Sequence, residues 1–153
     1  MGERAERSER VSQISMPPER SYVVIARNFV GDVAAEESWI SASRLDDLRL
    51  AVSEAVTNAI VAESEHGVQE QILIRCLADD AQFEVRIRDH AGGFDAPSVA
   101  VPVPEPDPAR EGGFGLPLMS ALVDEASFEV SDDGTEVCLT LRRVVETDAS
   151  SGV

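Results

Sequence analysis

Basic residues are scarce in this chain of 153 residues. Only 13 Lys and Arg side chains stand against 29 Asp and Glu, for a formal net charge of -16 and a pI near 4.3. A surface of this charge repels nucleic-acid phosphates and anionic lipid headgroups. The composition therefore argues against direct nucleic-acid or membrane binding, and we expect proteins or small molecules as partners.

Cysteine and long apolar runs are scarce as well. Cys76 and Cys138 each lie in an apolar, strand-like run, without metal-site spacing to another Cys or His, so we expect buried free thiols of a reducing compartment. No apolar stretch is long enough to span a bilayer. The charged first residues are not followed by an apolar segment, and Glu6 stands where myristoylation needs Ser or Thr. We expect a cytoplasmic protein.

The length suits one compact domain. Residues 1–10 and 146–153 are polar, with little to bury, and are predicted to be flexible tails around a domain of residues 11–145.

Hydrophobic periodicity predicts the order of the elements in this domain. Residues 11–16 alternate like an edge strand, and a helical stripe starts at Tyr22. Ser43, with Asp46 three residues later, predicts the start of a second helix. Further segments are predicted as a hairpin of strands over 71–77 and 83–89, a helix over 115–126, and a second hairpin within 127–144 that turns at Asp133 and Gly134.

Five of the eight prolines lie between His90 and Gly112. This stretch is predicted to be irregular, with residues 96–110 forming a lid over a binding site. The full order favours an α+β two-layer sandwich with helices on one face of a mostly antiparallel sheet.

Two stretches carry polar residues that could perform chemistry. In "SEAVTNAI", Glu54 and Asn58 share one helix face away from the apolar stripe and could share a metal ion or a water. Taken alone, such a pair on a polar helix face more often consists of solvated side chains without a function. In "IRDHAGGFD", Asp89 ends a strand just before Gly92 and Gly93. Asp89 could accept hydrogen bonds from a ligand's amino group, or the stretch could be a simple turn.

The third stretch is "AREGGFGLPLM". Gly112, Gly113 and Gly115 at the start of a helix leave backbone N–H groups free for phosphate, and Arg110 adds positive charge. The pattern matches neither the Walker phosphate loop nor a dinucleotide fingerprint.

Together, in this order and with a lid between the last two, the stretches resemble the nucleotide-binding boxes of the GHKL ATPase superfamily. These are an N box on a helix, a D-x-G-x-G box after a strand, and a G-x-G box that closes the lid. The segments "LRLAVSEAVTNAI" and "REGGFGLPLMSALVDEASFEV" are most similar to the bacterial anti-sigma-factor serine/threonine kinases, and the resemblance runs from Tyr22 to Arg142. It implies the Bergerat ATP-binding fold.

The resemblance also implies a role for each box. Glu54 would be the general base for an acceptor serine, Asn58 would hold the Mg²⁺ that bridges the phosphates of ATP, and Asp89 would read the adenine amino group. The residues that would wrap the nucleotide are Gly93, Arg110, Gly112, Gly113, Phe114, Gly115 and Leu116.

The family implies two protein partners, a sigma factor that is sequestered and an anti-sigma-factor antagonist that is phosphorylated on serine, and it implies a homodimer. The chain departs from the family pattern at Ala62, where relatives often carry a basic residue, and at Ala91, where the D-x-G-x-G box has its first glycine.

Three alternatives stay open. The chain could be a non-catalytic ATP-binding module that sequesters a regulatory partner. It could be the catalytic domain of a histidine kinase, although its histidines, His66 and His90, lie in no long dimerising helix. It could also be a plain α+β domain with chance glycines.

Overall fold

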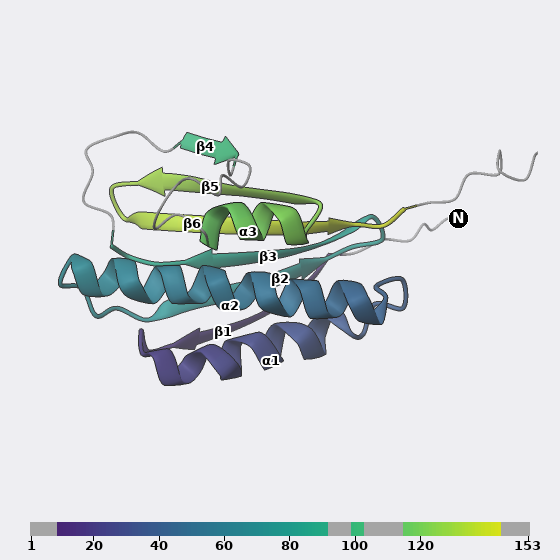
Figure 1. The fold of residues 1–153 in the computed structure, drawn as a ribbon, viewed down its shortest axis with the longest axis horizontal. Helices are drawn as coiled ribbons and strands as arrows, with labels where there is room; N and C mark the ends of the chain where they lie inside the picture. The colour runs from purple at the N-terminus through teal and green to yellow at the C-terminus, as the bar shows by residue number, and fades with distance from the viewer. Residues whose placement is uncertain (1–8, 92–98, 103–114, 145–153) are drawn as a thin grey trace, which may run out of the picture.

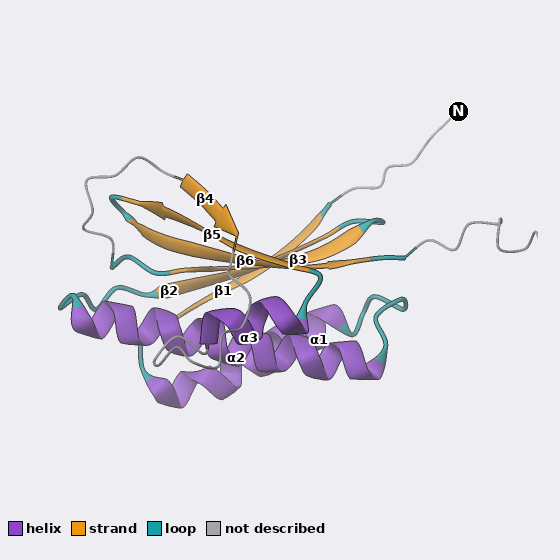
Figure 2. Cartoon of the chain, turned by 45° about the horizontal axis from the view of Figure 1, so that its top comes forward, coloured by secondary structure: helices purple, strands orange, loops and turns teal. Residues whose placement is uncertain are grey.

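The computed structural model describes residues 9–91, 99–102 and 115–144. In these residues, three α-helices and a short 3-10 helix pack on one face of a six-stranded sheet, which confirms the predicted α+β sandwich (Figures 1 and 2). All strand pairs are antiparallel, in the order β1-β2-β3-β6-β5-β4. The elements are β1 Arg10–Met16, η1 Arg20–Tyr22, α1 Val23–Ala34, α2 Ala42–Glu65, β2 Ile72–Ala78, β3 Gln82–Arg88, β4 Val99–Pro102, α3 Gly115–Leu122, β5 Glu125–Ser131 and β6 Gly134–Arg142.

The core lies between the sheet and the helices. Strand β3 buries every second side chain, Phe83, Val85 and Ile87, as expected for a strand covered on one face. Helix α2 contacts both α1 and α3, and its apolar stripe meets the sheet. In the described part of the chain, no helix is both long and apolar enough to cross a membrane.

Helix α2 begins two residues earlier than the sequence predicts. Ser41, in an extended conformation, caps the helix because its side-chain oxygen accepts a hydrogen bond from the Arg44 N–H at 3.2 Å. Ser43, predicted to start the helix, lies inside the first turn. Either serine hydroxyl could cap the helix, so the sequence pattern alone did not identify Ser41 as the cap.

Helix α3 is shorter than the predicted 115–126 because the chain joins the sheet after Leu122. The Asp124 N–H donates to the Thr140 carbonyl at 3.0 Å, and the Asp124 carboxylate accepts from the Arg142 N–H at 2.6 Å. These bonds to β6 start the β5 pairing at Glu125.

The predicted turn at Asp133 and Gly134 is displaced by one residue. Ser131 pairs with Gly134, so Asp132 and Asp133 form the turn and Gly134 is the first residue of β6.

The stretch rich in proline contains a strand that the sequence analysis did not predict. Residues 99–102 form β4, which pairs with β5 at the edge of the sheet. Proline is tolerated on an edge strand, where no further ladder bond is needed. The rest of the predicted lid, 96–98 and 103–110, lies outside the described residues, as do residues 1–8 of the predicted N-terminal tail and the whole predicted C-terminal tail, 146–153.

The two cysteines are free, but only one of them is fully buried. Cys76 faces the helices, whereas Cys138 is half-buried on the uncovered face, between the buried Val137 and Leu139. Desolvation by burial raises the pKa of each thiol to about 12. Both cysteines therefore remain protonated thiols at neutral pH.

Candidate functional site

Glu54 and Asn58 lie one turn apart on α2, on a partly exposed face. The neighbouring Ala55 and Ala59 are buried, so the two polar side chains point off the core stripe. Within the described ranges, no residue hydrogen-bonds the side chain of Glu54 or Asn58. A carboxylate and an amide are thus available together for a ligand or a reacting hydroxyl.

Oxygen atoms of this kind suit Mg²⁺, which takes few protein ligands and keeps several waters. Among the described residues, no group of three or more His, Cys, Asp or Glu could hold a metal ion. An ion held by the side-chain oxygen of Asn58 would therefore complete its shell with phosphate and water oxygens. A single oxygen from Asn58 therefore suits a Mg²⁺ ion that binds together with a nucleotide better than a metal ion that the protein alone would hold.

Asp89 follows β3 directly and is 6% exposed. Its Oδ1 accepts hydrogen bonds from the Ala91 N–H at 2.9 Å and the Thr135 N–H at 3.2 Å. The Asp89 N–H donates in turn to the Thr135 carbonyl at 2.9 Å. A carboxylate has more acceptor sites than these two bonds use. Asp89 is therefore held in place by the backbone and can still accept a hydrogen bond from a ligand.

Gly134 belongs to this end of the site, although the sequence analysis assigned it only to a hairpin turn. Its φ is +141°, and an added Cβ would lie 2.0 Å from the Asp89 carbonyl oxygen. Only glycine lets β6 pass this close to the backbone of Asp89.

Glu63 is a buried charged residue beside the candidate site that was not predicted from the sequence. Its side chain is fully buried, with Oε1 accepting from the Glu70 N–H at 2.9 Å and Oε2 from the His90 N–H at 2.7 Å. A signal was present, because Glu63 continues the helical stripe through Val56 and Ile60. A charged residue at a core position requires specific partners.

Ala91 and Ala62, where the chain departs from the pattern of the family it resembles, both lie among the described residues. Ala91 is buried, and no non-glycine residue in the described ranges has a positive φ. Alanine is therefore unstrained where the family has glycine. Ala62 is half-buried near the end of α2 and supplies no charge.

The third box is only partly placed. Gly115 and Leu116 start α3, which packs against α2, the helix that carries Glu54 and Asn58. The other predicted residues of the nucleotide wrap, Gly93, Arg110, Gly112, Gly113 and Phe114, lie outside the described residues.

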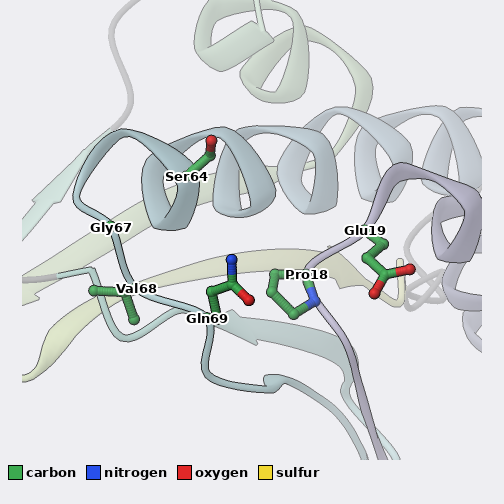
Figure 3. Close-up of a pocket in the computed structure, with 6 residues that line it drawn as sticks. All are labelled: Pro18, Glu19, Ser64, Gly67, Val68 and Gln69. Carbon is green, nitrogen blue, oxygen red and sulfur yellow. The ribbon is translucent and has the colours of Figure 1, made fainter.

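A separate pocket lies between the β1–η1 connection and the end of α2 (Figure 3). It has a volume of about 240 Å³ and contains none of the predicted site residues; its lining consists of Pro18, Glu19, Ser64, Gly67, Val68 and Gln69.

Comparisons with known proteins agree with this architecture. A family model described as a histidine kinase-like ATPase domain matches residues 16–141. The chain is 30% identical over 139 residues to serine-protein kinase RsbW of Bacillus subtilis, covering 84% of this chain and 82% of that protein. It is 31% identical over 119 residues to serine-protein kinase RsbW of Oceanobacillus iheyensis, covering 74% and 75%.

A solved structure shares the fold. The crystal structure of the RsbU and RsbW domains of a Mycobacterium tuberculosis protein is similar with a TM-score of 0.62 and 22% identity. The match covers 90% of this chain and 35% of that longer chain.

Proposed function

Because the chain belongs to the histidine kinase-like ATPase domain family, we propose that it is an ATP-dependent serine/threonine kinase and anti-sigma factor. It sequesters a sigma factor and phosphorylates an antagonist protein on serine. The observation that carries the proposal is the pair Glu54 and Asn58, one turn apart on α2 and unpaired among the described residues. Relatives that cover most of the chain are named serine-protein kinases, which supports the assignment.

Each described site residue has one task in this proposal. Asp89 accepts a hydrogen bond from the adenine amino group, with its carboxylate already oriented by the N–H groups of Ala91 and Thr135. Asn58 contributes an oxygen to Mg²⁺. When bound, ATP supplies the phosphoryl group and the ion neutralises its charge.

Glu54 is the proposed general base. Its carboxylate would take the proton of the acceptor serine hydroxyl as that oxygen attacks the γ-phosphorus of ATP, while the bond from the γ-phosphorus to the bridging oxygen breaks and ADP leaves. A protein that only binds ATP does not need a base at this position. The backbone around Gly93, Gly112, Gly113 and Gly115, with Arg110, Phe114 and Leu116, is proposed to wrap the nucleotide.

The proposed setting is the cytoplasm, and the proposed assembly is a homodimer. The net charge of -16 favours protein partners over nucleic acid or membrane.

A second candidate function is a non-catalytic module that sequesters a regulatory partner and binds ATP as a structural ligand. The specific observation behind it is Ala62, which leaves the end of the N box without a basic side chain.

A transfer assay separates the two functions. The antagonist is recovered from the host by its binding to this chain without added ATP, so that its serine is still free, and transfer from radiolabelled ATP in the presence of Mg²⁺ is then measured. Glu54→Gln should slow transfer by about a hundredfold or more, because the amide has the same shape but cannot take the proton. Glu65→Gln, an exposed change on the same helix, should transfer normally.

Two outcomes would count against the kinase. If the wild type transfers no phosphate to any antagonist of its host, the sequestering module is the better account. If Glu54→Gln transfers at the wild-type rate, Glu54 is not the base.

A further inference from the structure

Glu63 joins three parts of the fold through one buried carboxylate. It projects from the last turns of α2, and it binds the backbone of Glu70, which precedes β2, and of His90, which follows β3. Both contacts are to main-chain N–H groups, at 2.9 and 2.7 Å. The carboxylate therefore fixes the path of the chain at these two positions whatever side chains they carry.

The contact to His90 bears directly on Asp89. The peptide group between Asp89 and His90 supplies the N–H that donates to Glu63. On the other side of Asp89, its own N–H donates to the Thr135 carbonyl. The backbone is thus held on both sides of the Asp89 Cα, by β6 and by α2. Loss of the Glu63 contact removes the hydrogen bond of the peptide group between Asp89 and His90, which among the described residues is then confined only where its carbonyl meets Gly134.

The imidazole of His90 is not needed for this contact. Its Nδ1 lies 3.8 Å from Glu63 Oε2, beyond hydrogen-bond distance, and the ring is 36% exposed. The main-chain N–H of His90 makes the short bond, so the side chain can be removed without removing the donor.

An acceptor at position 63 is needed for this arrangement, and an apolar side chain would not supply it. A residue such as Met would continue the stripe of Val56 and Ile60 without the cost of burying a carboxylate. It would also leave the N–H groups of Glu70 and His90 without their acceptor. Burying the Glu63 carboxylate is unfavourable by itself, but its hydrogen bonds fix the backbone beside Asp89.

We propose that Glu63 is a positioning residue for adenine recognition. By holding the peptide that follows Asp89, it sets the direction in which the Asp89 carboxylate meets the amino group of the base. The inference rests on the proposed binding of ATP and adds a residue that determines its base specificity.

The test compares two nucleotides that differ only in the amino group. Binding of ATP and of purine riboside triphosphate, which lacks that group, is measured by calorimetry for the wild type and for Glu63→Gln. The wild type should prefer ATP by about tenfold, the value of a hydrogen bond to a charged acceptor. Glu63→Gln should keep its affinity for purine riboside triphosphate but lose most of the preference for ATP. Its side-chain NH₂ is a donor, so it cannot accept the hydrogen bond from one of the two main-chain N–H groups.

Three further variants complete the design. His90→Ala keeps the main-chain donor, and Glu65→Gln changes an exposed carboxylate of the same helix; both should retain the preference for ATP. Glu63→Met removes both acceptor oxygens without burying a stranded amide, and it should lose the preference even if Glu63→Gln does not fold. Circular dichroism verifies the fold of each variant.

The outcomes separate this inference from the proposed function. If the wild type binds neither nucleotide, the proposed function fails and the inference fails with it. If the wild type prefers ATP and the folded Glu63 variants prefer it equally, only the inference is overturned. The same holds if these variants lose affinity for both nucleotides to the same extent, since that result indicates a merely structural role.

Discussion

The two described ends of the site are built differently. Asp89 is buried and held by main-chain bonds to β6, beside a peptide that α2 also holds. Glu54 and Asn58 stand on a partly exposed helix face and contact no hydrogen-bond partner among the described residues. At the Asp89 end, the carboxylate that we propose to recognise adenine is oriented by the protein backbone. On α2, the side chains proposed for chemistry contribute little to the fold, so they can be changed without unfolding it.

The largest expected effect comes from Gly134→Ala. The new Cβ would lie 2.0 Å from the Asp89 carbonyl oxygen, in a contact between two main chains that cannot move apart cheaply. The free energy of unfolding, measured by urea denaturation, should fall by about 3 kcal/mol or more.

Gly67→Ala is the matched control for this change. Gly67 also has a positive φ, of +69°, but nothing lies within 4 Å of an added Cβ. It should lose only about 1 kcal/mol. Equal losses for the two variants would show that backbone conformation alone, and not the close approach to Asp89, explains the effect.

Asp89→Asn should have the next largest effect. The amide oxygen can still accept the bonds from Ala91 and Thr135, so the fold should persist. The amide N–H₂ would then face the adenine amino group, donor against donor, and ATP affinity in calorimetry should fall by about tenfold or more. GTP, which has a carbonyl at that position, should bind far more weakly than ATP to the wild type. Unimpaired ATP binding by Asp89→Asn would remove Asp89 from this role.

Asn58→Ala should change stability least. Its side chain contacts no hydrogen-bond partner in the described structure, so the free energy of unfolding should stay within about 0.5 kcal/mol of the wild type. ATP affinity should fall by about tenfold in the presence of Mg²⁺, because the ion loses a protein oxygen. Without Mg²⁺ the variant and the wild type should bind equally. A loss of the same size without the ion would assign Asn58 to the nucleotide itself.

The sequence predicts the elements of this fold well because periodicity reports which faces are buried. The long helix α2 and the hairpin of β2 and β3 follow from their apolar spacing. Boundaries that depend on a single competing contact were not predictable. Ser41 rather than Ser43 caps α2, and the bonds of Asp124 to β6 end the helical segment early.

The candidate site could be predicted where its residues form a motif and not where a contact joins distant segments. The N box and the strand end that carries Asp89 can both be recognised as motifs in the sequence. The contact between Glu63 and the N–H of His90 spans 27 positions, and the close approach of Gly134 to Asp89 crosses between strands. Such contacts depend on the sheet order, which single-sequence patterns do not determine.

Steady-state phosphoryl-transfer kinetics with varied ATP test most directly whether recognition and chemistry lie at different ends of the site. Glu54→Gln should lower kcat by about a hundredfold with little change in the KM for ATP. Asp89→Asn should raise the KM for ATP by about tenfold while kcat is largely kept. If both variants change the same parameter by the same factor, the proposed division between the buried Asp89 end and the open face of α2 is wrong.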